Sequence, residues 1–412
     1  MSLDAAMNSL QEALDRALDE LPYRIVADRV RSKANEAGVR LSDKEIDRFV
    51  KHLAAEQDGE FRFRTWRWWD RRELTISLGE TDRDQILATF ESFLSDGLEG
   101  FVQGISEDLA SEILATLRTT WPKQLRHESR QVRGFERRLD SRWGAAIERL
   151  LMTLIVCREL GELAAATYHG DDDAPEKLVD VLSRLHARAC QVTEEIVCLL
   201  RSGLADGAMA RWRTLHEIAA VGLFLSQNDM ALAERYAEHQ AVESFRAASE
   251  YRRCCEALGY EPISDDDFTA IKESRDQLVE RHGKEFATQY GWAAHVLGVP
   301  RPTLRDIHRA AGVEHLQAHY RLASHNVHAN PTGAFLRLGL LDDVDVLLAG
   351  RSDVGLDEPG VSCSISLSQI TVAFATLSPN LDLLVGIKIV EMLRDETISL
   401  FDQVASEAPL CG

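Results

Sequence analysis

Apolar residues recur at the spacing of an α-helix along most of this chain. Long segments with this pattern are joined by short polar turns, and they span residues 147–168, 173–203, 204–227 and 230–260. Consecutive amphipathic helices with short connections are typical of antiparallel bundles, because each helix must bury one apolar stripe. We therefore predict a mainly all-α fold that is built on an antiparallel helical bundle.

The N-terminal part has shorter helical patterns that are separate from this bundle. Ser42 precedes an apolar stripe and is followed three positions later by Glu45, which is typical of a helix start. Gly38 is suited to end the helix before it. Between Glu60 and Gly79 aromatic and arginine residues partly alternate at a period of two, which predicts a strand or a short β hairpin.

These patterns divide the chain into three parts. We predict a small helical region at residues 1–80, a helical connector rich in basic residues at 81–142, and the bundle with its C-terminal helices at 143–412. After Pro331 the helical periodicity is lost, so we expect an exposed loop at residues 350–364 before the last helices.

Composition and charge narrow the possible classes of function. The chain has 412 residues, of which 45% are hydrophobic, and a net charge of −20. This fits a globular protein and disfavours broad binding to nucleic acid or to anionic membranes. The N-terminus lacks the apolar core of a signal peptide, and no apolar run reaches the length of a membrane span. We expect a soluble cytoplasmic protein without a membrane partner.

Two local segments are basic despite the acidic total. In the first, arginines alternate with aromatic side chains, and we predict nucleic-acid contacts at Arg62, Arg64, Arg67, Trp68 and Trp69. The alternative is a linker that its tryptophans hold against the next domain. The second segment is a stripe on one helical face, formed by Arg126, Arg130, Arg133 and Arg137. It suits either a phosphate backbone or a solvated surface that faces the acidic remainder of the protein.

The sequence contains no motif for a metal or a cofactor. Its 7 cysteines are scattered without paired CxxC spacing, so we expect reduced thiols in the core and no metal site. His315 and His319 are four positions apart near Glu314, but an isolated pair of this kind is more often not a metal site. The motifs of nucleotide triphosphatases, dinucleotide-binding enzymes, zinc proteases and serine hydrolases are missing, so we expect no cofactor.

The segment from His319 to Gly333 carries the most distinctive set of polar side chains. On a helix, one face would hold Arg321, Ser324, His325 and His328. Pro331 disfavours helical geometry in the residue before it, so the helix should end close to His328. The partial negative charge at a helix C-terminus favours protonated histidine, which would prepare the imidazoles for acid–base chemistry.

A second polar cluster lies upstream, in the segment RWRTLHEIAAVGLF. Its first half contains Arg211, Arg213 and Glu217, and its second half is apolar. Arg213 and Glu217 are four positions apart, which allows a surface ion pair. If they face inward instead, the polar face of the 319–328 helix is the expected partner. In that arrangement the pair would hold the imidazoles in place for proton transfer.

These motifs carry a resemblance to a known family. RWRTLHEIAAVGLF, ERYAEHQ and YRLASHNVH before a proline resemble domain-of-unknown-function family 5677 over roughly residues 145–330. That family looks like a relative of the HEPN helical-bundle domains. HEPN ribonucleases carry an arginine, then four to six residues, then a histidine, and six residues separate Arg321 from His328. Leu322 departs from the pattern, because a polar residue commonly follows the arginine in those enzymes.

The resemblance implies a metal-independent endoribonuclease that acts in bacterial anti-phage defence or in a toxin-like role. His328 would serve as general acid or base, and Arg321 would stabilise charge on the phosphate. Ser324 and His325 would orient or assist, and support would come from Arg211, Arg213 and Glu217. Sites in such enzymes are typically shared across a dimer, which implies a homodimer that binds RNA.

A non-catalytic protein is the alternative. His325 and His328 would then cap the carbonyls at a helix end, and Arg213 and Arg321 would form a buried ion network with Glu217. The chain would act as a helical binding or scaffold protein that contacts a protein partner or nucleic acid.

Overall fold

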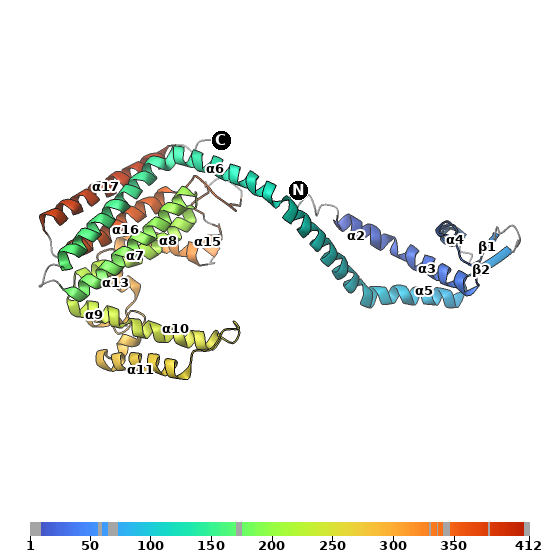
Figure 1. The fold of residues 1–412 in the computed structure, drawn as a ribbon, viewed down its shortest axis with the longest axis horizontal. Helices are drawn as coiled ribbons and strands as arrows, with labels where there is room; N and C mark the ends of the chain where they lie inside the picture. The colour runs from blue at the N-terminus through green and yellow to red at the C-terminus, as the bar shows by residue number, and fades with distance from the viewer. Residues whose placement is uncertain are drawn as a thin grey trace. The chain divides into compact units, whose positions relative to one another are not determined.

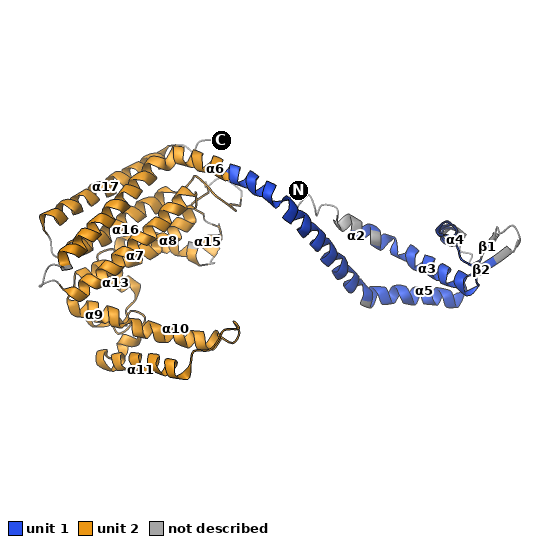
Figure 2. Cartoon of the chain, viewed as in Figure 1, with its two compact units in different colours: residues 1–131 blue, residues 132–412 orange. Residues whose placement is uncertain are grey.

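The computed structural model describes residues 10–56, 60–64, 73–169, 175–328, 331–335, 337–340, 347–377 and 380–407. These residues form helices and one two-stranded antiparallel sheet (Figure 1). The predicted all-α class and the predicted hairpin are therefore confirmed. The chain divides into two compact units, Met1–Gln131 and Val132–Gly412, which Figure 2 shows in different colours.

The first unit combines short helices with the β hairpin. Its elements in chain order are α2 (Leu10–Asp19), α3 (Leu21–Glu36), α4 (Asp43–Glu56), β1 (Glu60–Arg64), β2 (Glu73–Ser77) and α5 (Glu80–Ser92). Val30 of α3, Phe49 of α4 and Ile76 of β2 are buried in one small core. Burial of these side chains holds two of the helices to the hairpin, since removing apolar surface from water is favourable.

Local signals set the ends of these helices as the sequence predicts. At the start of α4 the backbone N–H and the hydroxyl of Ser42 both donate to the Glu45 carboxylate, at 2.8 and 2.6 Å. Gly38 follows α3 with a φ of 75°, a left-handed conformation that costs glycine little because it has no Cβ. Both predicted helix boundaries are confirmed.

A helix of 72 residues, α6 (Leu98–His169), follows the π-helical segment η1 (Phe93–Gly97). It passes without a break through residues 142 and 143, where the sequence pattern places a domain boundary. The connector is therefore helical, as expected, and the boundary stays a prediction. All members of the basic stripe are exposed on this helix: Arg126, Arg130, Arg133 and Arg137.

The second unit contains the helical bundle that the apolar spacing predicts. Its long helices are the C-terminal half of α6, α7 (Glu176–Arg201), α8 (Ala205–Ser226), α16 (Asp357–Ala375) and α17 (Leu381–Ser406). The largest buried side chains of its core include Trp143, Trp212, Phe374 and Phe401. Each of these four side chains lies on a different helix, and α7 adds buried aliphatic residues to the same core. The core therefore joins all five helices.

One member of the bundle differs from the prediction. The segment 230–260, expected as one long helix, divides into α9 (Met230–Glu238) and α10 (Gln240–Cys254). The bundle position beside α7 and α8 is instead taken by α16. The expectation of an exposed loop up to residue 364 is therefore wrong from Asp357 onward.

Small polar residues explain why the apolar spacing of the sequence does not predict the start of α16. Its buried residues include Ser364, Ser366 and Ser368, which look hydrophilic in a sequence. Two of these hydroxyls find partners inside the bundle: Ser368 Oγ donates to the backbone oxygen of Ser364 at 2.8 Å, and Ser366 Oγ accepts from the Trp212 indole at 2.9 Å. The buried Ser364 Oγ has no partner among the described residues. Because these side chains are small, α16 can approach α8 closely.

Shorter elements complete the second unit between α10 and α16. They are α11 (Asp265–His282), η2 (Lys284–Ala287), η3 (Gly291–Ala293), α12 (Ala294–Leu297), α13 (Leu304–Ala310), η4 (Glu314–Leu316), α14 (Gln317–Val327) and α15 (Pro331–Phe335). α10 and α11 pair with each other, while α13 and α14 pack against α8. None of the helices described in either unit is long and apolar enough to cross a membrane.

The cysteines of the bundle core are free thiols. Cys157, Cys190 and Cys363 are buried, and none is in a disulfide. Burial raises their pKa to about 12, 11 and 12 respectively. These thiols are therefore inert at neutral pH, as expected for reduced cysteines that pack like small apolar side chains.

Candidate functional site

The two polar motifs of the sequence meet where α14 packs against α8. α14 ends at Val327, and His328 has an extended backbone with a φ of −105° and a ψ of 138°. His328 therefore follows the helix, and the expectation that it lies on the helical face of Arg321 is wrong. Pro331 starts α15, where its missing N–H costs no hydrogen bond, so the predicted end of the His-bearing helix is confirmed.

Tyr320 connects the two helices, although it is not among the site residues that the sequence predicts. Its hydroxyl donates to Glu217 Oε1 at 2.6 Å and accepts from Arg213 Nε at 2.8 Å. Arg213 Nε also lies 3.2 Å from Glu217 Oε1, and the guanidinium carbon stands 4.9 Å from the centre of the Tyr320 ring. Arg213 and Glu217 thus face inward and contact α14, which is the second arrangement that the sequence allows.

Burial and charge set the protonation of this cluster. Burial acts to lower the pKa of Arg213, but the hydrogen bond that Arg213 donates to Tyr320 and the charge of Glu217 outweigh burial and raise the pKa above its ordinary value. Burial, and then the hydrogen bond to Glu217, raise the pKa of Tyr320. Arg213 therefore stays charged and Tyr320 stays protonated at neutral pH, so the phenol remains the donor to the carboxylate.

His328 lies at the exposed edge of this cluster. Its Nε2 atom is 3.4 Å from Arg213 Nη1, a long contact for a hydrogen bond, and its side chain is open to solvent. A guanidinium can only donate, so the contact requires a lone pair on Nε2 and hence a neutral imidazole. The geometry presents His328 as a proton acceptor.

The other members of the predicted site lie on α14. Arg321 is exposed and forms no ion pair within the described part of the chain. Ser324 Oγ donates to Tyr320 O at 2.9 Å, so its hydroxyl is engaged by the helix backbone. His325 is half-buried. Arg321 is thus the cation of this helix whose charge is available to an anion.

Arg211 is the supporting residue that the fold directs elsewhere. Its guanidinium pairs with Glu195 on α7 and contacts Thr214 Oγ1 at 3.3 Å. The expectation that Arg211 supports the histidines is therefore wrong, because residues two positions apart on a helix point to different sides. Of the supporting residues, Arg213 contacts His328, and Glu217 joins the cluster through Arg213 and Tyr320.

Buried tryptophan and histidine side chains pack near the Tyr320 ring. His216 is fully buried and stacks on Trp212 with ring centres 5.1 Å apart, while His308 lies 4.7 Å away. Burial lowers the pKa of His216 to about 3, and the proximity of His308 adds to this effect. Neither ring nitrogen of His216 has a hydrogen-bond partner among the described residues. His216 is therefore a neutral packing residue whose ring lies 5.9 Å from Tyr320.

The other histidine pair of the sequence does not gather ligands for a metal. His319 Nδ1 is hydrogen-bonded to the Glu358 carboxylate of α16. Across the residues that the structure describes, no group of three histidine, cysteine, aspartate or glutamate side chains is placed to hold a metal ion.

The predicted nucleic-acid contacts are described only in part. Arg62 is exposed on β1, and Arg64 belongs to the same strand. The side chain of Arg64 and the whole of Arg67, Trp68 and Trp69 lie outside the described residues. This contact surface stays a prediction.

The family comparison covers the same region as the site. Residues 179–345 match the model of a family of unknown function, DUF5677. The DUF5677 segment contains both α8 and α14, and it bears out the resemblance drawn from the sequence motifs. No curated protein and no solved structure matches the chain.

Proposed function

We propose that this protein is a metal-independent endoribonuclease with His328 and Arg213 at its reaction centre. The observation that carries the proposal is the 3.4 Å contact between Arg213 Nη1 and His328 Nε2 at a solvent-exposed edge. An accessible imidazole beside an anchored guanidinium combines a proton acceptor with a group that binds phosphate. The resemblance of the DUF5677 motifs to HEPN ribonucleases supports the same chemistry.

In the proposed reaction the neutral imidazole of His328 takes the proton of a ribose 2′-hydroxyl. The 2′-oxygen then attacks the adjacent phosphorus and the bond to the 5′-oxygen breaks, which leaves a 2′,3′-cyclic phosphate. The leaving 5′-oxygen receives a proton from His325 in its protonated form. Arg213 and Arg321 neutralise the charge that builds up on the phosphate oxygens.

The hydrogen bonds around Arg213 account for its role in this scheme. Tyr320 and Glu217 both bind its Nε atom, so the guanidinium is held before the substrate arrives. A group that is already oriented needs no rearrangement when charge develops in the transition state. Arg321 has no such partner and would be ordered by the phosphate itself.

RNA cleavage in EDTA tests this proposal directly. The wild-type protein should cleave RNA with the chelator present and leave products with a 2′,3′-cyclic phosphate. His328→Ala should lower the rate by about a hundredfold or more, as expected for loss of a general base. His295→Ala is the matched control, since His295 is exposed on α12 and lies in a different element. Cleavage that requires a metal, or that survives His328→Ala, would reject the mechanism.

The wider setting is part of the same proposal and rests on family likeness. Composite sites in HEPN ribonucleases favour a homodimer, and their biology favours an effector of bacterial anti-phage defence or a toxin-like protein in the cytoplasm. Size-exclusion chromatography with light scattering tests the dimer. A monomer that cleaves RNA at full rate would remove the dimer from the proposal.

A non-catalytic binding protein is the second candidate. It is favoured by the complete set of partners around Glu217, Tyr320 and Arg213, which is also what a structural ion network needs. In that case the exposed Arg62 and its neighbours would supply the contact to nucleic acid. An Arg62/Arg64/Arg67 triple alanine variant should then reduce the salt dependence of RNA binding, and an unchanged slope would reject that contact.

A further inference from the structure

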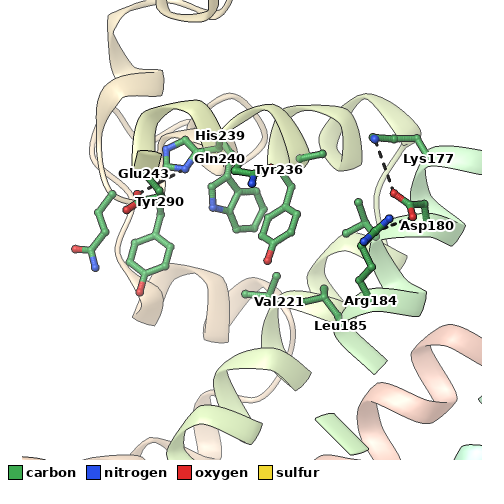
Figure 3. A pocket seen from close by; sticks show the side chains of 14 residues that line it. Lys177, Asp180, Arg184, Leu185, Val221, Tyr236, His239, Gln240, Glu243 and Tyr290 are labelled. Carbon is green, nitrogen blue, oxygen red and sulfur yellow. Dashed lines mark hydrogen bonds and ion pairs between the residues drawn. The ribbon is translucent and has the colours of Figure 1, made fainter. Parts of the chain in front are cut away.

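The second unit contains a cleft whose lining residues are not part of the candidate site described above. It has a volume of about 890 Å³ and is lined by residues from the start of α7, from α8, from α9 and α10, and from the segment between η2 and η3. Sites for small molecules commonly have volumes of about 300–1,000 Å³. Figure 3 shows Lys177 and Arg184 at one end of this cleft and Tyr290 at the other, with Tyr236 between them.

Aromatic residues form the central wall of the cleft. Tyr236 and Trp292 pack edge to face with ring centres 5.0 Å apart, and Trp292 is almost fully buried. The Tyr236 hydroxyl and the Trp292 indole N–H have no hydrogen-bond partner within the described ranges. Both residues line the cleft, and neither atom is among the fully buried unpaired atoms of the described residues, so both are accessible to a ligand in the cleft.

The end of the cleft that α7 forms is cationic. Asp180 accepts from Arg184 Nε at 2.8 Å and lies 3.9 Å from Lys177 Nζ. This bond orients the Arg184 fork but uses only its Nε atom, and the two terminal amino groups have no partner among the described residues. Two cations and one carboxylate leave a net positive charge, with a planar donor pair that matches a phosphate.

The aromatic end adjoins the candidate site along one face of α8. Arg213, Glu217 and Val221 are spaced by four residues, and Val221 lines the cleft. Burial raises the pKa of Tyr290, the charge of Glu217 adds to this, and that of Arg213 opposes it. Tyr290 therefore stands close enough to both residues to sense their charges.

We propose that this cleft binds a nucleotide, with the base against Tyr236 and Tyr290 and a phosphate on Arg184 and Lys177. A base offers a flat ring for the aromatic wall and polar edges for the free Tyr236 hydroxyl and Trp292 N–H. The carboxamide of Gln240, which also lines the cleft, can both donate and accept on the base edge. The nucleotide is either free or part of an RNA strand, since both present the same chemistry.

Isothermal titration of the full chain with the four ribonucleoside 5′-monophosphates tests this site. At least one should bind saturably, whereas ribose 5-phosphate and the matching nucleoside should each bind more weakly, because each lacks one half of the recognised group. No saturable binding of any monophosphate would overturn the proposal, and so would equal affinity for the nucleoside and its monophosphate.

Single substitutions separate the two ends of the cleft. Arg184→Ala should weaken monophosphate binding by about tenfold, the loss of one charge-assisted contact, and should leave nucleoside binding unchanged. Tyr290→Leu should weaken the binding of both the monophosphate and the nucleoside. Arg188→Ala is the matched control, because Arg188 lies one turn further along α7 and outside the cleft. Since the Arg184 side chain is 78% exposed, its loss leaves the fold intact, and unchanged binding in Arg184→Ala would reject the phosphate end.

A short 2′-O-methyl oligonucleotide, which cannot be cleaved through its 2′-position, distinguishes the two sources of the nucleotide. If the cleft holds one nucleotide of a strand, the oligonucleotide should displace the bound monophosphate, and Arg184→Ala should weaken that displacement. If the ligand is a free nucleotide, the oligonucleotide should not compete. Failure of RNA cleavage with monophosphate binding intact would reject the proposed ribonuclease and leave this site standing.

Discussion

The Tyr320 hydroxyl donates a hydrogen bond of 2.6 Å to Glu217, across the contact between α14 and α8. The same oxygen accepts from Arg213, so one phenol joins a carboxylate and a guanidinium from a helix about a hundred residues earlier in the chain. This relationship fixes the direction of Arg213 toward His328. The cluster therefore depends on a residue that contributes no charge.

Removing that hydroxyl is the first test of the cluster. Tyr320→Phe keeps the ring but removes the bonds to Glu217 and Arg213. It should reduce the free energy of unfolding by about 1–3 kcal/mol, because two hydrogen bonds to charged groups are lost. RNA cleavage should fall by about tenfold or more, because Arg213 loses its orientation. Urea unfolding and a cleavage assay measure the two effects.

A tyrosine outside the site provides the control for this variant. Tyr260 is 59% exposed and lies beyond the end of α10, so Tyr260→Phe should change neither quantity. If Tyr320→Phe loses stability but cleaves at the wild-type rate, the hydroxyl has a structural role only. The proposed positioning of Arg213 would then be wrong.

Gly333 tests the backbone that carries His328. A Cβ atom at this position would lie 2.1 Å from the His325 carbonyl oxygen, which is far inside van der Waals contact. Gly333→Ala should therefore push α15 away from the end of α14, destabilise the protein by about 1–3 kcal/mol and lower cleavage. Thermal unfolding and the cleavage assay measure both.

Gly350 offers a matched substitution in open space. A Cβ atom there meets nothing within 4 Å, so Gly350→Ala should behave like the wild type. Cleavage by Gly333→Ala at the wild-type rate would show that the position of His328 does not matter for activity.

His216 should make the second unit sensitive to acid. Burial lowers its pKa from 6.5 to about 3, so the unfolded chain takes up a proton below about pH 6.5 while the folded chain does not. The stabilising contribution is complete above pH 6.5 and is lost as the pH falls toward 3. The loss is at most about 1.4 kcal/mol for each pH unit.

Replacing His216 by phenylalanine removes this titration and retains a flat ring to stack on Trp212. Between pH 7 and pH 5 the His216→Phe variant should lose less stability to urea than the wild type, by about 2 kcal/mol over that range. His186, whose pKa burial lowers to about 4, still titrates in both proteins. His295→Ala, at an exposed histidine, should keep the wild-type pH dependence. An equal loss in His216→Phe and the wild type would show that His216 is not the group concerned.

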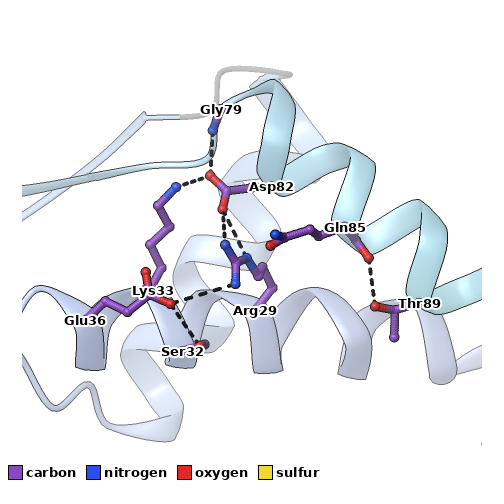
Figure 4. Close-up of polar contacts among 8 residues, drawn as sticks. All are labelled: Arg29, Ser32, Lys33, Glu36, Gly79, Asp82, Gln85 and Thr89. Carbon is purple, nitrogen blue, oxygen red and sulfur yellow. Dashed lines mark hydrogen bonds and ion pairs between the residues drawn. The ribbon is translucent and has the colours of Figure 1, made fainter.

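Asp82 should make the first unit sensitive to acid (Figure 4). The side chain is buried, yet it accepts from Arg29 Nη2 at 2.6 Å, from the Gly79 N–H at 2.9 Å and from Lys33. Burial acts to raise its pKa, but these donors outweigh burial and lower the pKa to about 2. Its contribution is present above the ordinary value of 3.8 and is lost as the pH falls through about 2.

Asp82→Asn should loosen the contact between α3 and α5, because two cations lose their shared anion. We expect a loss of about 1–3 kcal/mol at pH 7, seen as faster amide hydrogen exchange in both helices of the full chain. Asp84→Asn is the control, since Asp84 is exposed on the same helix α5. Exchange in α3 that does not change in Asp82→Asn would contradict a stabilising role of the ion pairs.

Several features were predictable because they depend on neighbours in sequence. The Ser42–Glu45 bond at the start of α4 and the end of the His-bearing helix before Pro331 involve residues only a few positions apart. Apolar spacing likewise shows that a helix buries one face. It does not show which other helix covers that face, and for this reason the sequence predicts residues 230–260 in the bundle position that α16 occupies.

The chain by itself determined a helical protein with two polar motifs that belong together. Only the tertiary structure decided that Tyr320 joins them, that Arg211 turns to α7, that His328 leaves the helix, and that a cleft opens beside Val221. The physical reason is that these outcomes depend on the packing of side chains from distant segments. Glu217 and Tyr320 are 103 residues apart, and the periodicity of either helix carries no information about the other's shape.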